Sequence, residues 1–228
     1  MRYAQREAGF RSGIEPVLLA ASIPARPGEH ALEGGSGAGA TLLCLAARVA
    51  GVQGIGIEQD PALADLAARN AAENGFSGLR FSVADVASWQ SPAMFDHACA
   101  NPPYHPAGGT PSPDRAQRAA KQAPDGLLAR WAAALARPLR ARGTLTFILP
   151  AAHAPDAIAA FTEAGCRPTA MLPLWPMAEQ PAKLMLLRGV KGGRAPFRVL
   201  RGLVLHRPDG GFTEQAEAIL REARPLPL

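Results

Sequence analysis

Short apolar runs alternate with longer stretches rich in Ala and Leu from the start of the chain to Leu149. Gly, Pro and Asp bound the runs, which have the length of buried strands, and the stretches between them have the length of helices. This alternation predicts βαβ units that share a mostly parallel sheet. Strands are expected at 30–33, 54–58, 79–84, 96–100 and 144–149, and helices at 40–50, 61–74 and 126–140.

The helix expected at 61–74 has clear boundary residues. Asp60 suits an N-cap, Pro61 suits the first helical position, and Gly75 suits the residue that ends the helix.

The pattern changes after Leu149. A helix at 155–164 leads to strands at 169–174 and 183–189, which are too close for a helical crossover and should form an antiparallel hairpin at the sheet edge. A last strand at 201–206 and a helix at 213–221 complete the expected order. No long polar linker interrupts the chain, so residues 1–228 are expected to form one α/β domain that includes 183–228 as a basic C-terminal strand and helix extension.

Composition excludes several classes of protein. Hydrophobic residues make up 48% of the 228 residues, which is enough for a core and excludes general disorder. Cys44, Cys99 and Cys166 form no CxxC pair, so neither a disulfide framework nor a metal site is expected. The N-terminus is charged and no long apolar run follows, which predicts a cytoplasmic protein without a membrane segment. The oligomeric state does not follow from these patterns.

A glycine-rich loop, Glu33-Gly34-Gly35-Ser36-Gly37-Ala38-Gly39, separates the first expected strand from the helix at 40–50. Glycines let a backbone turn tightly and approach a ligand at a helix N-terminus. Because Gly35 to Ala40 also satisfies GxGxxA, a dinucleotide-binding loop is an alternative at this point, as is a purely structural turn.

Two further acidic residues follow the next strands. Glu58 ends the second strand, where a carboxylate can accept both hydroxyl protons of a ribose. Asp85, followed by Val86, comes after the third strand, from which a carboxylate could contact an adenine amino group. A single acidic residue at the end of a strand is often only a solvated cap, but three in register at the carboxyl ends of consecutive strands are much less expected by chance.

This arrangement resembles class I S-adenosylmethionine-dependent methyltransferases, which have a Rossmann-like fold with a mostly parallel seven-stranded sheet, an antiparallel edge hairpin and helices on both faces. The resemblance implies that S-adenosylmethionine is the cofactor, with its methionine part on Glu33, Gly35, Gly37 and Gly39, its ribose on Glu58 and its adenine on Asp85 and Val86. Glu33 stands where that family more often has Asp.

The tetrapeptide Asn101-Pro102-Pro103-Tyr104 follows the fourth expected strand. It resembles the (N/D)PP(Y/F) signature of methyltransferases that modify planar nitrogens. In that reading Asn101, at the border of the cofactor pocket, and the Pro102 carbonyl accept the two hydrogens of an exocyclic amine and aim its lone pair at the methyl group. Tyr104 would stack on the flat substrate.

The segment Gly9-Phe10-Arg11-Ser12-Gly13-Ile14-Glu15 through Ala20 resembles the GYRxGxDxxLLA segment of bacterial tRNA1(Val) adenine-N6 methyltransferases, with Glu15 in place of the usual Asp. The likeness continues to Lys191-Gly192-Gly193 and to the segment from Gly202 to His206. It implies that the substrate is the adenine at position 37 of a tRNA.

Basic residues gather where RNA is expected to bind. The chain carries 24 Lys and Arg against 19 Asp and Glu, and no acidic residue lies between Lys183 and Arg207. Such an excess suits a polyanionic partner, although a solvated edge is the alternative. Trp131 and Trp175 are expected to be packing residues. The residues expected to contact RNA are Tyr104, His105, Arg115, Arg118, Lys121, Arg188, Lys191, Arg194 and Arg198.

Other functions remain open on the sequence alone. The same chemistry could act on an rRNA guanine N2 or on a protein glutamine amide, and the fold could serve as a non-catalytic RNA-binding module. A nicotinamide-dependent dehydrogenase is disfavoured, since Asn101-Pro102-Pro103-Tyr104 has no role in hydride transfer.

Overall fold

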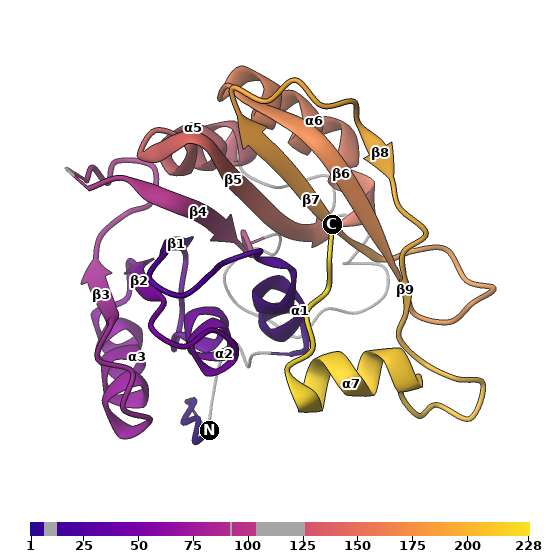
Figure 1. Ribbon diagram of the computed structural model, residues 1–228, viewed down its shortest axis with the longest axis horizontal. Coiled ribbons are helices and arrows are strands. Elements are labelled where there is room, and N and C mark those ends of the chain that lie inside the picture. The colour runs from indigo at the N-terminus through magenta and orange to yellow at the C-terminus, as the bar shows by residue number, and fades with distance from the viewer. Residues whose placement is uncertain (7–12, 92, 104–125) are drawn as a thin grey trace.

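A computed structural model of the chain describes residues 1–6, 13–91, 93–103 and 126–228. Its centre is a single sheet in the order β3-β2-β1-β4-β5-β7-β6-β8, with β9 also paired to β6 (Figure 1). The order reverses at β1, because β2 and β3 lie on one side of it while β4 and β5 lie on the other. In open α/β sheets, ligands bind at such a reversal, outside the carboxyl ends of the strands.

The strands expected from the sequence are present, with ends shifted by three residues or fewer except for β5 (Leu139–Pro150), whose first residues lie in the range 126–140 that was expected to be helical. They are β1 (His30–Gly34), β2 (Gln53–Glu58), β3 (Leu79–Val83), β4 (Phe95–Ala100), β5 (Leu139–Pro150), β6 (Cys166–Trp175), β7 (Leu184–Lys191) and β9 (Leu203–Val204). The sequence did not predict β8 (Arg198–Val199), a strand of two residues.

The hairpin of β6 and β7 is antiparallel, as expected, and with β1 to β5 it makes seven strands in the part of the chain that the structure describes. β7 inserts antiparallel between β5 and β6, so β6 runs parallel to β4 and β5. The outer side of β6 is then covered by the short parallel strands β8 and β9, which raise the total within the described ranges to nine. The edge of the sheet is therefore formed by this C-terminal segment rather than by the hairpin itself.

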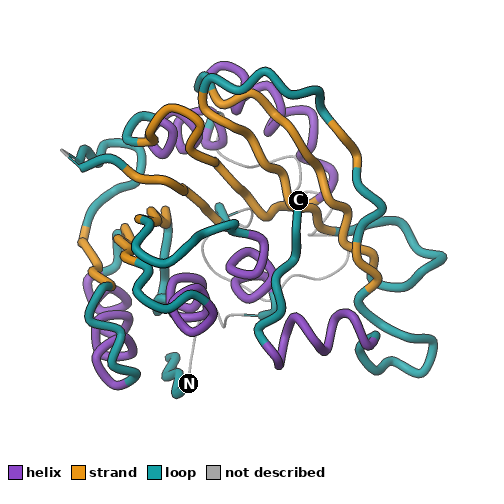
Figure 2. The backbone as a smooth tube through the Cα atoms, in the orientation of Figure 1, coloured by secondary structure: helices purple, strands orange, loops and turns teal. Residues whose placement is uncertain are grey.

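Helices cover both faces of the sheet (Figure 2). They are α1 (Glu15–Ser22), α2 (Ala40–Arg48), α3 (Pro61–Glu73), α5 (Leu127–Ala136), α6 (Ala154–Glu163) and α7 (Glu214–Glu222), with a 3-10 turn, η1, at Ala151–His153. One buried cluster joins α1, α2 and α7 to the sheet, and a second joins α5 and α6 to it. Because Ile219 and Leu226 belong to the first cluster, the C-terminal residues share the core of the N-terminal ones.

The predicted boundaries of α3 are confirmed. The Asp60 side chain accepts hydrogen bonds from the backbone N–H groups of Ala62 and Leu63, and Pro61 occupies the first turn. Gly75, just beyond the C-cap, has φ +72°, a conformation that costs little only for glycine.

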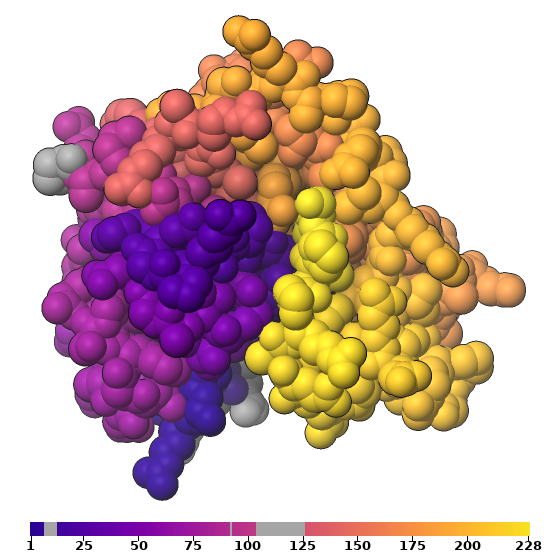
Figure 3. Space-filling model, in the orientation of Figure 1, coloured from indigo at the N-terminus to yellow at the C-terminus, as the bar shows by residue number. Residues whose placement is uncertain are grey.

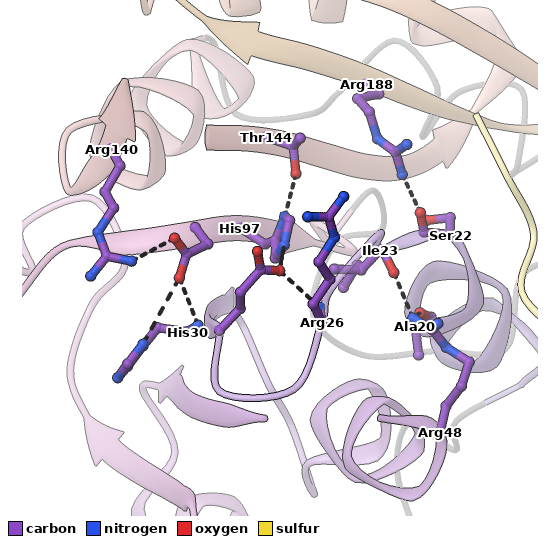
Figure 4. A network of polar contacts seen from close by, with 12 residues as sticks. Ala20, Ser22, Ile23, Arg26, His30, Arg48, His97, Arg140, Thr144 and Arg188 are labelled. Atoms are coloured by element: carbon purple, nitrogen blue, oxygen red, sulfur yellow. Dashed lines mark hydrogen bonds and ion pairs between the residues drawn. The ribbon is translucent and has the colours of Figure 1, made fainter. Parts of the chain in front are cut away.

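Helix α1 was not predicted from the sequence. Six of its eight residues are buried, so its apolar positions have no helical period that would identify it. Its C-terminal carbonyls are bound by arginines from elsewhere: Arg48 donates to the carbonyl of Ala20 and Arg188 donates to that of Ser22 (Figure 4). The helix is thus stabilised by tertiary contacts more than by its local sequence.

Candidate functional site at the carboxyl edge of the sheet

The carboxyl ends of four parallel strands meet at one edge. Gly34 pairs with Ile57 on one side and with Ala100 on the other, and Glu58 pairs with Val83. The residues that directly follow β1, β2, β3 and β4 therefore lie side by side. These are the glycine loop, the end of β2, the Asp85 turn and the Asn101 motif, so the structure brings the predicted cofactor and catalytic segments together.

The glycine loop turns back over β2. Gly35 and Ser36 both donate their backbone N–H groups to the carbonyl of Ile57, at 2.8 and 3.0 Å. Gly35, Gly37 and Gly39 have φ values of +68°, +55° and +87°, which residues with a Cβ adopt only with strain. A Cβ on Gly35 would lie 2.8 Å from the Trp131 ring, so Trp131 supports the loop as the packing residue expected from the sequence.

Gly39→Ala should destabilise the protein by about 3 kcal/mol, because its left-handed backbone adds strain and its Cβ would meet Phe81 at 2.9 Å and Ala67 at 3.1 Å. The matched control is Gly75→Ala, which has φ +72° and open space around the new Cβ, and which should cost about 1 kcal/mol. Urea denaturation measures both. Equal losses would mean that the packing around Gly39 does not matter.

Glu33, one residue before the end of β1, has a buried carboxyl group, and the residue is 3% exposed. Burial raises the pKa of Glu33 to about 8, against the opposing effect of hydrogen bonds from Thr41 and Leu42, and the nearby Glu58 raises it further. Within the described residues, Glu33 Oε2 and the buried hydroxyl of Ser36 have no hydrogen-bond partner. Two buried polar atoms without partners, beside a loop of left-handed glycines, fit a bound ligand that brings a cationic donor.

The raised pKa predicts how Glu33 affects stability. The folded state holds this proton up to about pH 8, whereas an unfolded glutamic acid releases it near 4.5. The contribution of Glu33 to the free energy of unfolding is therefore full below pH 4.5 and is lost as the pH rises to 8. Glu33→Gln should remove this decline between pH 5 and 8.

Thermal denaturation at several pH values compares the wild type with Glu33→Gln and with Glu163→Gln, a change at an exposed position of α6. The same pH dependence in Glu33→Gln and the wild type would show that Glu33 does not carry the proton.

Glu58, predicted to hold a ribose, binds the backbone of the glycine loop in this structure. Its two carboxylate oxygens accept hydrogen bonds from the backbone N–H groups of Gly37 and Asp60, both at 2.9 Å. Asp85 is exposed and caps the next turn, with Oδ1 accepting from the N–H of Ala87 at 2.6 Å. Val86 is buried, and a Cβ on Gly34 would lie 3.1 Å from its Cγ1. All three lie around the glycine loop, and their contacts with a nucleoside stay predictions.

The sequence did not indicate Asn70, which ties the N-terminus to the glycine loop. Its side chain is 1% exposed and its Nδ2 donates to the carbonyls of Ala4 and Ala38, at 2.9 and 3.0 Å. Arg6 also forms an ion pair with Asp60, at 2.9 Å. Residues 1–6 thus cover α3 beside the loop. A lone Asn inside a helix gives no local signal of such a contact, because its partners lie far away in the sequence.

The Asn101 motif begins one residue after the pair formed by Gly34 and Ala100. Asn101 is half-buried and Pro102 is buried. These two residues lie next to the glycine loop, as predicted for groups that act on the transferred methyl. Tyr104, His105, Arg115, Arg118 and Lys121 lie outside the described residues, and their roles stay predictions.

Arg188 corrects one prediction for the RNA surface. The residue is only 6% exposed, and its guanidinium donates to the carbonyl of Ser22 (Figure 4). The guanidinium also donates to the carbonyl of Leu228 and to the hydroxyl of Thr146. Burial lowers the pKa of Arg188 to about 10, which still leaves it charged at neutral pH. Arg188 therefore joins α1 and the C-terminus to the sheet, and it does not face RNA.

Lys191 was also predicted to contact RNA, and its contacts in the structure contradict this prediction. Its ammonium group donates to the carbonyls of Ala136, Arg137 and Leu139, at 2.8–2.9 Å, and so caps the C-terminal end of α5. All three of its hydrogens are used in these bonds. Because β7 is antiparallel, its last residue also lies at the sheet edge opposite the Asn101 motif. Arg194 and Arg198, by contrast, are exposed.

Within the described part of the chain, no helix is long and apolar enough to cross a membrane. Among these same residues no group of His, Cys, Asp or Glu is arranged to hold a metal ion.

The sheet order, the glycine loop and the strand-end acids define a class I methyltransferase, a class that uses S-adenosylmethionine as methyl donor. The sequence matches the methyltransferase small domain family over residues 15–130, and the chain belongs to that family. The matched range runs from the first residue of α1 to within α5, so it contains the glycine loop and the Asn101 motif.

Two curated relatives carry the same name, tRNA1(Val) (adenine(37)-N6)-methyltransferase. The protein from Dickeya chrysanthemi is 28% identical over 96% of this chain and 89% of its own length. That from Actinobacillus succinogenes is 33% identical over 62% of this chain and 61% of its own length. A crystal structure from Agrobacterium tumefaciens, described as a predicted O-methyltransferase, shares the fold with a TM-score of 0.76 at 21% identity, over 94% of this chain and 99% of that one.

Proposed function

We propose that this protein transfers a methyl group from S-adenosylmethionine to the exocyclic N6 of an adenine in tRNA, at position 37 beside the anticodon. The observation that carries the proposal is the position of Asn101 and Pro102, directly after β4 and next to the Glu33 loop. The names of the two curated relatives support the choice of substrate. A tRNA substrate places the proposed reaction in the cytoplasm.

The chemistry follows from the weak nucleophilicity of an exocyclic amine, whose lone pair is delocalised into the ring. In the proposed reaction, the bound cofactor supplies an electrophilic methyl group on a sulfonium. The Asn101 side-chain oxygen and the Pro102 carbonyl accept the two amine hydrogens, raise the electron density on nitrogen and orient its lone pair. The nitrogen would form a bond to the methyl carbon as the carbon–sulfur bond breaks and leaves its electron pair on sulfur, and the amine would release one proton to water. Catalysis then rests on positioning and on preorganised dipoles rather than on a strong base.

The substrate side of the proposal rests on an exposed basic segment at the sheet edge. Arg194, Arg198 and Arg201 are exposed, and no acidic residue lies among them. Phe197, 40% exposed, lies within the same segment. Cationic side chains interleaved with an exposed aromatic ring suit a single-stranded RNA backbone and its bases. An anticodon loop is single-stranded, so its base leaves the stack at lower cost than a base in a duplex.

The decisive experiment incubates the protein with cofactor labelled in its methyl group and with total tRNA from a strain that lacks the enzyme. Nucleoside analysis should recover the label as N6-methyladenosine. Label in guanosine would indicate the N2 chemistry, and label only in protein would indicate a glutamine amide. Either result, or cofactor binding without transfer to any RNA, would contradict the proposal.

Asn101→Ala should reduce kcat on tRNA by about 100-fold or more, because one positioned acceptor of the amine hydrogens is lost. Affinity for S-adenosylmethionine, measured by calorimetry, should stay nearly unchanged. Asn101→Asp keeps an acceptor oxygen at the same place and should retain more activity than the alanine variant. A large loss of cofactor affinity in Asn101→Ala would assign this residue to cofactor binding instead.

Replacing both Arg194 and Arg198 with Gln should weaken tRNA binding most at low salt. Each lost phosphate contact should reduce the slope of log affinity against log salt by about 0.7–0.9. The control is Arg69→Gln, an exposed arginine of α3, which packs against β2 and β3 on the other side of the sheet from β8. An unchanged slope in the double variant would show that these arginines do not contact RNA phosphates and only form a solvated edge of the sheet.

A further inference from the structure

A cavity of about 730 Å³ lies between the end of β6, the residues that follow β8 and the start of α7. In Figure 3 the yellow atoms of α7 and the C-terminus border the orange atoms of this region. Its volume is that of a pocket for a small organic ligand. Its lining includes Leu172, Trp175, Arg201, Thr213, Gln215 and Leu226.

The position of Trp175, the aromatic residue in the lining of the cavity, depends on a glycine at position 202. Trp175 Nε1 donates to the carbonyl of Arg201 at 3.3 Å. Gly202 has φ +87°, and a Cβ there would lie 2.4 Å from that same nitrogen, so only glycine lets the indole lie against this turn. Trp175 is half-buried. Trp175, expected from the sequence to be a packing residue, packs against the Gly202 turn and also lines the cavity.

The cavity opens at the same edge of the sheet as the Asn101 motif, since β6 runs parallel to β4. Across the sheet Ala100 is aligned with Phe147, then with Leu187 and then with Met171. Three strand spacings amount to about 14 Å, and the four residues from Met171 to Trp175 add about 13 Å along the strand. Asn101 and the cavity are thus close enough for one single-stranded loop to reach both.

The lining matches the chemistry of a nucleotide. Arg201 is exposed and follows Arg194 and Arg198 along the basic segment, so the cationic edge leads into the cavity. Gln215, also exposed, offers amide donors and acceptors for the polar edge of a base. Leu172 and Leu226 add apolar walls. The hydroxyl of Thr213 is already used, because it donates to the carbonyl of Val204 and caps α7.

We infer that this cavity is a subsite for a second nucleotide of the RNA substrate, whose base stacks on Trp175 and whose phosphate contacts Arg201. The inference rests on the proposed function, because it takes the target adenine to lie at Asn101. The subsite binds a nucleotide near the target in the same RNA loop and so contributes to the choice of RNA.

The test measures methylation of a synthetic anticodon stem-loop RNA. Arg201→Gln and Trp175→Leu should each raise KM for this RNA roughly tenfold, as expected for one stacked base or one phosphate contact. Gln215→Ala should raise it about threefold. kcat and cofactor affinity should not change, because the subsite is remote from the methyl group. Arg142→Gln, which removes the same charge elsewhere, should leave KM unchanged.

The variants at Arg201 and Gln215 change exposed side chains and keep the test valid if Trp175→Leu does not fold. If the wild type methylates the stem-loop and KM is unaltered in both Arg201→Gln and Gln215→Ala, the subsite is overturned. An equal rise of KM in Arg142→Gln would also overturn it. If the wild type does not methylate the stem-loop, the proposed function fails. The dissociation constant of the RNA then decides the subsite: weaker binding by Arg201→Gln than by Arg142→Gln supports it, and equal binding rejects it.

Discussion

The parallel alignment of β1 with β2 and β4 is the constraint on which the rest of the site depends. Because Gly34 is in register with both Ile57 and Ala100, three segments that are distant in the sequence end at one place on the sheet. The glycine loop then has to turn within a few residues, with left-handed backbone at Gly35, Gly37 and Gly39, to connect β1 to α2 above β2. Neither the buried carboxyl of Glu33 nor the position of Asn101 would exist without this register.

Charge is divided between the two parts of the site in a way that suits methyl transfer to RNA. Burial raises the pKa of Glu33 to about 8, so its carboxyl group is protonated at neutral pH in the folded protein. A cationic part of the cofactor is expected to bind beside this group. Exposed arginines follow the outer side of β6 toward the cavity beside Trp175. The proposed reaction needs little acid or base from the protein, because Asn101 and Pro102 are proposed to place two acceptors around one amine.

Two basic residues show why composition alone does not locate an RNA surface. Arg188 and Lys191 lie in β7, in the same acid-free stretch as Arg194 and Arg198. Yet Arg188 is buried against Ser22, and Lys191 caps α5 at the far edge of the sheet. A strand places alternate side chains on opposite faces, and its direction in the sheet decides which edge its ends reach. Only the pairing of β7 with β5 and β6 determines which face the Arg188 side chain occupies and which edge of the sheet Lys191 reaches.

The sequence by itself determined the βαβ order, the boundaries of α3, the glycine loop with its acidic companions and the Asn101 motif, because local backbone demands and strand-end positions carry these features. It also indicated the antiparallel pairing of β6 with β7. The tertiary structure alone decided the buried helix α1, the contact of Asn70 with the N-terminus, the inward position of Arg188 and the cavity beside Trp175. Each of these joins residues far apart in the chain, and such long-range contacts follow from packing and strand register, which no local pattern encodes.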